Sequence, residues 1–198
     1  MTWIAAALTG FALSACAGLR VFLPLFAAGL AARLAEWPLA AGAEWLASDA
    51  ALVSFGVATA VEIAADKVPA LDHLLDGAQT FLAPAAGALL AASSFGDLPP
   101  WAALALGVAT GAPIAGGVHL LAATTRLQSS LFTAGAGNPV LSLAEDVLAA
   151  VGAVVAFVWP VLVVATGIGA AFWIRRRRRR RAARARAASP APAPGRGG

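Results

Sequence analysis

Residues 147–174 read VLAAVGAVVAFVWPVLVVATGIGAAFWI and contain no charged side chain. A membrane-spanning helix needs about 20 apolar residues. At 1.5 Å per residue this run would be about 42 Å long as one helix, which exceeds the roughly 30 Å of a bilayer core. Seven consecutive arginines, residues 175–181, follow it directly. Because basic residues stay on the cytoplasmic side of a membrane, the run predicts a membrane segment that ends in the cytoplasm.

The composition of the whole chain also predicts a membrane location. Of its 198 residues, 60% are hydrophobic and 12% are charged. An ordinary soluble domain has about 45–50% apolar and about 25% charged residues. A soluble fold of this size exposes too much of its chain to hide that much apolar surface. We therefore expect an all-α, polytopic integral membrane protein.

The charged residues divide the chain into two parts. Ten of the fourteen basic residues lie in residues 175–198, so residues 1–174 carry four basic and ten acidic side chains. We expect a transmembrane helical domain over residues 1–174. Residues 175–198 are rich in arginine and then in Ala, Pro and Gly, a composition that predicts a disordered cytoplasmic tail.

Four other apolar segments precede the last one: residues 3–34, 50–66, 78–95 and 101–123. The first would be about 48 Å long as a straight helix, which is too long for one crossing. Arg20 lies near its middle, between Gly18 and Pro24. These residues predict a broken helix at that point.

The segment from residue 140 to the arginines decides the predicted topology. Trp159-Pro160 lies near its middle, and a hairpin there would make two short spans. Six spans then place both termini, Lys67 and Arg126 in the cytoplasm, as the rule for basic residues requires. One long final helix would instead leave the arginine tail outside. Six spans also divide as three plus three, the inverted repeat of many transporters.

The densest group of ionisable residues is Glu62-Ile-Ala-Ala-Asp66-Lys67-Val-Pro69-Ala-Leu-Asp72-His73-Leu-Leu-Asp76. Asp72, His73 and Asp76 could hold a divalent cation. The carboxylates could equally relay protons, since neighbouring carboxylates raise one another's pKa. Alternatively, Asp66, Lys67 and Asp76 are only solvated at the cytoplasmic boundary of the membrane. Glu62 lies about 6 Å deeper, where an unpaired carboxylate is costly, and this favours a functional role.

A second group is Asn138-Pro139-Val-Leu-Ser142-Leu-Ala-Glu145-Asp146. Asn138 before Pro139 is typical of a helix start. Ser142-x-x-Glu145 matches the capping box, in which both side chains only satisfy backbone N–H groups. Capping does not explain Asp146, because it occupies the next helix position and needs its own partner at membrane depth.

Arg20 and His119 are the other candidates at membrane depth. Arg20 lies too far from either membrane surface for its side chain to reach water easily, so we expect it to pair with Glu62, Glu145 or Asp146. His119 either carries a proton or is buried with a hydrogen bond to a backbone carbonyl.

Common catalytic and cofactor motifs are missing from the sequence. It contains no phosphate-binding loop, no zinc motif of ordinary spacing and no nucleophile elbow. We therefore expect no cofactor apart from the divalent ion considered above, and the sequence leans against an enzyme. Arginines that directly follow a membrane span fix its orientation and contact anionic lipid headgroups, so no nucleic acid is expected. The sequence leaves a homo-oligomer open.

Several stretches resemble a bacterial integral-membrane family catalogued as domain of unknown function 4126. They are Ala17-Gly-Leu-Arg20-Val-Phe-Leu-Pro24-Leu, the run from Glu62 to Asp76, Pro84-Ala-Ala-Gly87-Ala, and Gly137 to Asp146. The likeness covers about residues 5–165, and the run from Glu62 to Asp76 is its most distinctive part. The resemblance implies a multi-pass protein of the bacterial inner membrane, and it implies no reaction.

We expect a small secondary transporter or channel-like protein for a proton, an ion or a small solute. Ionisable residues at membrane depth are usually functional, and broken helices are typical of transporters. The site would comprise Arg20, Glu62, Asp66, His73, His119, Asn138, Glu145 and Asp146. One alternative is a metal-dependent enzyme that acts on a lipid with Asp72, His73 and Asp76. Another is a non-catalytic membrane scaffold, in which the charges only hold helices together.

Overall fold

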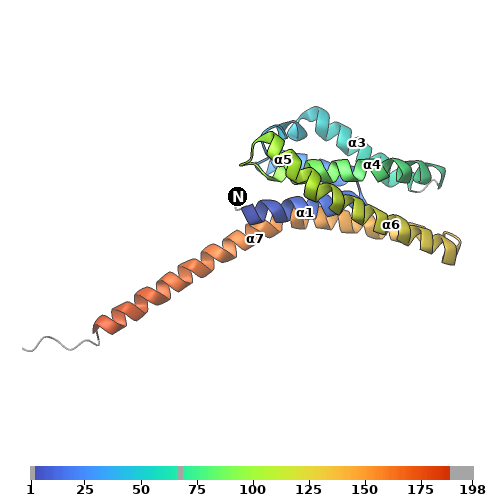
Figure 1. Cartoon of the computed structure of the whole chain (residues 1–198). Coiled ribbons are helices and arrows are strands. Elements are labelled where there is room, and N and C mark those ends of the chain that lie inside the picture. The colour runs from blue at the N-terminus through green and yellow to red at the C-terminus, as the bar shows by residue number, and fades with distance from the viewer. Residues whose placement is uncertain (1–2, 67–68, 188–198) are drawn as a thin grey trace, which may run out of the picture. The chain divides into compact units, whose positions relative to one another are not determined.

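The computed structural model describes residues 3–66 and 69–187. The chain divides into two units, Met1–Pro160 and Val161–Gly198. All regular elements within the described residues are helices, with η1 a 3-10 helix and η2 a π-helix (Figure 1). In chain order they are α1 (Trp3–Leu19), α2 (Phe22–Leu34), η1 (Glu44–Ala47), α3 (Asp49–Ala65), α4 (Pro69–Ser94), α5 (Pro100–Leu106), η2 (Gly107–Gly111), α6 (Ala112–Thr133) and α7 (Asn138–Ala187).

The first apolar segment is broken at Arg20, as the sequence predicts. α1 ends at Leu19, where the Arg20 N–H still donates to the Cys16 carbonyl at 2.9 Å, and α2 begins at Phe22. Pro24 explains where the break falls, because its ring would clash with the Arg20 carbonyl in a continuous helix. Within α2, Pro24 lies in the first turn, where backbone N–H groups have no intrahelical partner in any case.

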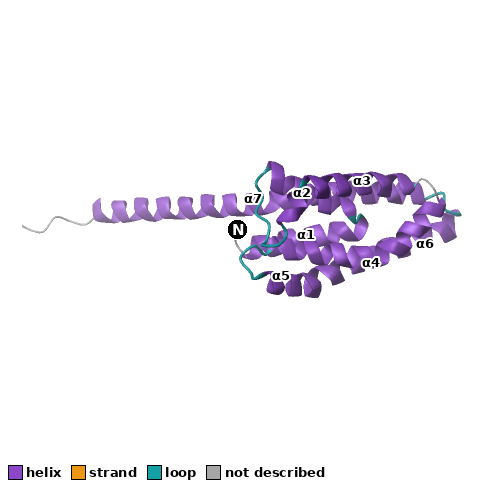
Figure 2. Cartoon of the chain, turned by 90° about the horizontal axis from the view of Figure 1, so that it is seen from above, coloured by secondary structure: helices purple, strands orange, loops and turns teal. Residues whose placement is uncertain are grey.

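α1 and α2 fold back on each other. The Thr9 hydroxyl of α1 donates to the Ala156 carbonyl of α7 at 3.2 Å. Trp37, just after α2, packs edge-on against Phe157 of α7, with ring centroids 5.2 Å apart. The middle of α1 and the segment just after α2 therefore lie at the same level of α7. Figure 2 shows the pair entering and leaving at one end of the first unit.

This path differs from the predicted topology, which placed the N-terminus and residues 35–49 on opposite sides of the membrane. Trp3 and Pro38 line the same small cavity. The reason is length: α1 has 17 residues and α2 has 13, so they reach about 25 Å and 20 Å. Irregular backbone at membrane depth, such as the turn at Arg20, is stable where protein surrounds it.

α7 runs without interruption through Trp159 and Pro160, so the predicted hairpin at this dipeptide is wrong. Proline lacks the N–H that would bond the carbonyl four residues earlier, which is that of Ala156. The Thr9 hydroxyl donates to this carbonyl instead. Because a neighbouring helix satisfies the freed acceptor, the proline does not force a turn. The first and last apolar segments therefore follow other paths than predicted. The alternation of the chain between the two membrane sides, on which six spans and a three-plus-three repeat depended, loses its basis. The orientation remains a prediction.

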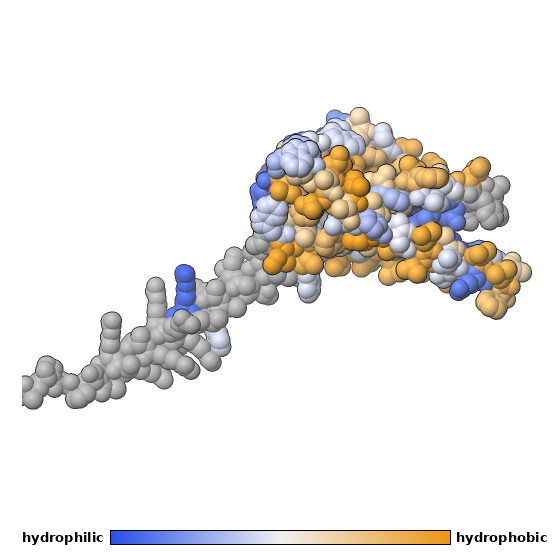
Figure 3. Space-filling model, in the orientation of Figure 1, coloured by the Kyte–Doolittle hydropathy of each residue, from blue (hydrophilic) through white to orange (hydrophobic). Residues whose placement is uncertain are grey.

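Three helices among the described residues are long and apolar enough to cross a membrane. Many of their large apolar side chains face outward, among them Leu131 and Phe132, which are 75% and 88% exposed. Figure 3 shows hydrophobic residues over much of the visible surface of the first unit. Lipid is the solvent that such an exterior requires. The three helices are Leu74–Ser94, Pro100–Thr133 and Asn138–Trp159.

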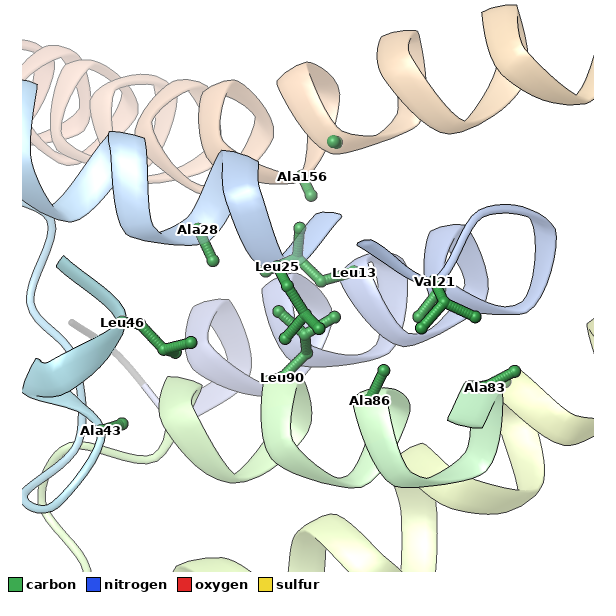
Figure 4. Packing of buried hydrophobic residues seen from close by; sticks show 13 residues of the cluster. Leu13, Val21, Leu25, Ala28, Ala43, Leu46, Ala83, Ala86, Leu90 and Ala156 are labelled. Atoms are coloured by element: carbon green, nitrogen blue, oxygen red, sulfur yellow. The ribbon is translucent and has the colours of Figure 1, made fainter. Parts of the chain in front are cut away.

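The core of the first unit lies where α1, α2, η1 and α4 meet. Leu13, Leu25, Leu46 and Leu90 are each at most 5% exposed there (Figure 4). α4 and η2 approach so closely that a Cβ on Gly111 would lie 2.2 Å from the backbone oxygen of Gly87. Small residues allow such close approach of helices in membranes.

The arginine run is helical in the structure. α7 continues to Ala187 and so includes residues 175–181, while the division of the chain into a transmembrane domain and a cytoplasmic tail stays a prediction. Arginine and alanine both favour helix, and extending an existing helix avoids the cost of nucleation. The rest of the predicted tail, residues 188–198, lies outside the described residues.

Candidate functional site

Arg20 is the centre of a polar cluster at the break between α1 and α2. Its side chain is completely buried. One terminal nitrogen, Nη2, donates to Asp66 and to the Ser142 hydroxyl, the latter at 2.9 Å. Its Nε lies 2.6 Å from Oδ1 of Asp146, within ion-pair distance but without the geometry of a hydrogen bond. Arg20 thus joins the end of α3 to the start of α7.

Glu62 of α3 lies against the first turn of α2. Its two carboxylate oxygens accept hydrogen bonds from the N–H groups of Val21 and Phe22, at 2.8 and 3.2 Å. The Gln79 amide of α4 donates to the same carboxylate at 2.6 Å. Helix N-termini carry unsatisfied N–H groups and a partial positive charge, so a carboxylate is stabilised there. The hydrogen bonds of Glu62 therefore explain it as the cap of α2. They also explain how its carboxylate can be buried, with only 1% of the residue exposed.

Asp66 and Ser142 connect this part of the cluster to α7. Asp66 follows α3, is 8% exposed at its side chain, and accepts hydrogen bonds from Arg20 and from the Ser142 hydroxyl. The sequence predicted that Ser142 and Glu145 form a capping box. This prediction is wrong, because α7 already begins at Asn138 and both side chains bind partners on other helices.

Arg126 of α6 is the centre of a second ion-pair group. It binds Glu145 of α7 through two nitrogens and lies 3.4 Å from Asp76 of α4. Glu145 is only 7% exposed, so its partner is needed to balance a buried charge. Arg126 also interacts electrostatically with Asp66, which links the two groups.

The two groups together contain more acid than base. Two arginines, Arg20 and Arg126, meet five carboxylates. With all side chains ionised, these described residues would carry a net charge of −3. The five carboxylates belong to Glu62, Asp66, Asp76, Glu145 and Asp146.

Two further predicted residues have contacts outside the cluster. His119 of α6 is buried, and its Nε2 lies 3.5 Å from the Thr80 hydroxyl of α4. Asn138, the first residue of α7, donates to the Ser130 hydroxyl at 2.8 Å, and its own oxygen is buried without a hydrogen-bond partner among the described residues. The structure therefore places Asn138 at a connection between α6 and α7.

Of the three predicted metal ligands, the structure describes the side chain of Asp76 alone. The side chains of Asp72 and His73 lie outside the described residues, and Asp76 is paired with Arg126. No group of three or more His, Cys, Asp or Glu side chains suited to a metal ion occurs among the residues that were described.

Sequence reasoning missed Gln79 and Thr80. Gln79 is the single amide side chain in the predicted span 78–95, and an uncharged polar residue within an apolar span was the available signal. At this end of the first unit, Figure 3 shows an indentation in the surface with hydrophilic residues on either side of it.

Fold and site together define an all-α membrane protein with an acidic polar cluster beside a helix that is broken at Arg20. The model of the family described as "Domain of unknown function (DUF4126)" matches residues 7–179. The chain belongs to this family, as the resemblance implied. A search of curated proteins finds no match, and a search of solved structures finds none either.

Proposed function

We propose that the protein is a small secondary transporter or channel-like protein that moves a proton or another small cation across the membrane. The proposal rests on the five carboxylates that share a partly buried cluster with two arginines. Ionisable groups at membrane depth are costly and usually serve ion or proton pathways. The excess of acid disfavours an anion as the transported species.

The broken helix supports the same proposal. In many transporters, interrupted helices place their ends beside the transported ion near the middle of the membrane. Here the break lies at Arg20, and Glu62 and Gln79 hold the first turn of α2 in place. A cation that binds beside this break could shift α1 and α2 relative to the other helices.

Flux measurements test the proposal. The full-length protein, reconstituted into lipid vesicles, should carry protons or monovalent cations down an imposed gradient. Arg20→Ala and Glu62→Ala should abolish that flux. Arg33→Ala and Glu44→Ala are matched controls, because both side chains are exposed outside the cluster, and both variants should retain the flux. A wild-type protein that carries no ion or small solute would reject the proposal.

The scaffold alternative gives a different result in one experiment. If the charges only hold helices together, exchanging a pair should restore function. The double variant Arg20→Asp, Asp66→Arg keeps the charges and reverses their places. A transport site should not tolerate this exchange, since its ligand approaches from one direction. Recovery of the wild-type phenotype in the exchanged protein would favour a scaffold.

A metal-dependent lipid enzyme remains a prediction from the sequence, and no observation among the described residues favours it. Its test is the metal content of the purified protein. Bound metal that is lost in His73→Ala would revive this alternative.

We also propose a bacterial inner-membrane location with both termini in the cytoplasm. The support is the arginine run after residue 174, which the charge rule places inside and which suits anionic lipid headgroups. Proteolysis of inside-out and right-side-out membrane vesicles tests this, because only the former should expose the tail. A homo-oligomer remains a prediction.

A further inference from the structure

The five carboxylates of the cluster differ in the hydrogen bonds they accept. Glu62 accepts three, from two backbone N–H groups and an amide. Asp66 accepts from Arg20 and from a hydroxyl, and Glu145 accepts from two nitrogens of Arg126. Each of these three carboxylates accepts at least two hydrogen bonds.

Asp76 and Asp146 are less well satisfied. Among the described residues, the Asp76 carboxylate has one weak contact, 3.4 Å from Arg126, and its side chain is 32% exposed, so solvent or headgroups can reach it. Asp146 differs, because its Oδ1 is buried and accepts no hydrogen bond among the described residues. Its side chain as a whole is 20% exposed, so the group can still be reached from outside the cluster.

Arg20, the ion-pair partner of Asp146, also has nitrogen atoms that donate no hydrogen bond among the described residues. Its side chain is completely buried, and neither Nη1 nor Nε makes a hydrogen bond among the described residues. A buried polar atom without a hydrogen bond costs about 1–3 kcal/mol, and more when it is charged. A donor without an acceptor therefore lies beside an acceptor without a donor, with Nε and Oδ1 2.6 Å apart.

The charge nearest to Asp146 is the Arg20 guanidinium, 2.6 Å away, and the cluster as a whole contains more acid than base. Arg20 lies at the break, Glu62 and Asp66 lie on α3 and at its end, and Asp76 lies on α4. Arg126 and His119 lie on α6, and Glu145 precedes Asp146 on α7. Arg20 must balance Asp66 as well as Asp146, since both carboxylates are its ion-pair partners. Neutralising one of the two would leave a balanced pair.

We propose that the transported species is a proton and that the Asp146 carboxylate is the group that binds it. A hydronium ion transfers its proton to the carboxylate, which gives water and a neutral carboxylic acid. The water oxygen can then accept a hydrogen bond from the guanidinium of Arg20. This inference rests on the proposed transport function and names its ligand.

Protonation has a structural consequence in this geometry. Neutral Asp146 loses its ion pair with Arg20, while the bonds from Arg20 to Asp66 and Ser142 remain. One of the two links between α7 and the turn of the α1–α2 pair is thereby weakened. Proton binding would thus change how firmly α7 is held against the broken helix.

The first test is proton flux into vesicles that contain a pH-sensitive dye, under an imposed pH gradient. Asp146→Asn should lower the flux at least about tenfold. Asp49→Asn is the matched control, since Asp49 also pairs with an arginine, Arg33, but is 84% exposed at its side chain. It should keep the wild-type flux. Equal flux in wild type and Asp146→Asn would overturn the inference.

The second test observes the proton itself. Infrared difference spectra of the reconstituted protein, recorded between high and low pH, should show the carbonyl stretch of a protonated carboxyl group. This band should be lost in Asp146→Asn and shifted in Asp146→Glu, which retains a carboxyl group if the asparagine variant does not fold. A band that is unchanged in both variants would overturn the assignment to Asp146.

The experiments distinguish a failure of the transport proposal from a failure of the inference that Asp146 binds a proton. If the wild type carries potassium or sodium but no protons, the proton inference is wrong and the transport proposal survives. If no flux of any kind is found, but the infrared band is present and depends on residue 146, the transport proposal is wrong and proton binding survives.

Discussion

The Thr9 hydroxyl donates a hydrogen bond to the carbonyl of Ala156, 3.2 Å away and 147 residues later in the chain. Ala156 is the residue whose carbonyl Pro160 leaves without a helical donor. The same contact therefore holds the middle of α1 against α7 and lets α7 continue through a proline. It accounts for the continuation of α7 through Pro160, one of the two places where the observed path of the chain departs from the predicted one.

Removal of the Thr9 hydroxyl should leave that carbonyl unsatisfied. We expect Thr9→Val to lower the free energy of unfolding by about 1–3 kcal/mol, measured by reversible denaturation in mixed micelles. In a Pro160→Ala background the alanine N–H restores the helical bond, so the same change should cost clearly less. Thr59→Val, which removes a bond within α3 only, is the control. An equal loss in both backgrounds would contradict this account.

Glu62 should be needed for the fold of α2 as well as for its charge. Glu62→Gln keeps the size of the side chain but directs an NH₂ group at N–H donors. We expect a loss of about 1–3 kcal/mol in the free energy of unfolding. Glu44 also accepts a bond from a backbone N–H, that of Gly42, but is exposed, so Glu44→Gln should change stability little. Similar effects at both positions would argue against a cap at Glu62.

The buried ion pair of Arg126 and Glu145 should contribute much more to the free energy of unfolding than the exposed pair of Arg33 and Asp49. Arg126→Ala leaves Glu145 buried without its partner, and we expect about 3–5 kcal/mol of destabilisation. Arg33 pairs with Asp49, and the two side chains are 45% and 84% exposed. Arg33→Ala should therefore cost at most about 1 kcal/mol. The free energies of unfolding of the two variants, measured in the same detergent, test this difference. Equal losses would show that Arg126 is solvated and not buried.

The contact between α4 and η2 should tolerate no added side chain. A Cβ on Gly87 would lie 2.5 Å from the backbone oxygen of Gly111, so Gly87→Ala should destabilise the protein by about 1–3 kcal/mol. Gly117 of α6 has nothing within 4 Å of such an atom. Gly117→Ala should be neutral, or stabilising by up to about 1 kcal/mol, because alanine favours helix. The thermal midpoints of the two variants check this order.

The candidate site shows what residue spacing can and cannot predict. Arg20, Glu62 and Asp146 were singled out because each lies at membrane depth in an apolar segment, and the structure brings them to one cluster. Their partners could not be deduced in the same way. Glu145, considered as a partner of Arg20, pairs with Arg126, and Glu62 caps α2. Pairing depends on which helix faces meet, and local sequence does not contain that information.

The sequence by itself determined the membrane environment, the helical class and the break at Arg20, because these follow from apolar length and from the backbone chemistry of proline. Only the tertiary structure decided that α1 and α2 return to one end and that α7 passes through Pro160. A proline frees a carbonyl, and whether the chain turns or continues depends on a donor from elsewhere. Here the donor is Thr9, which lies next to Ala156 only after the helices have packed.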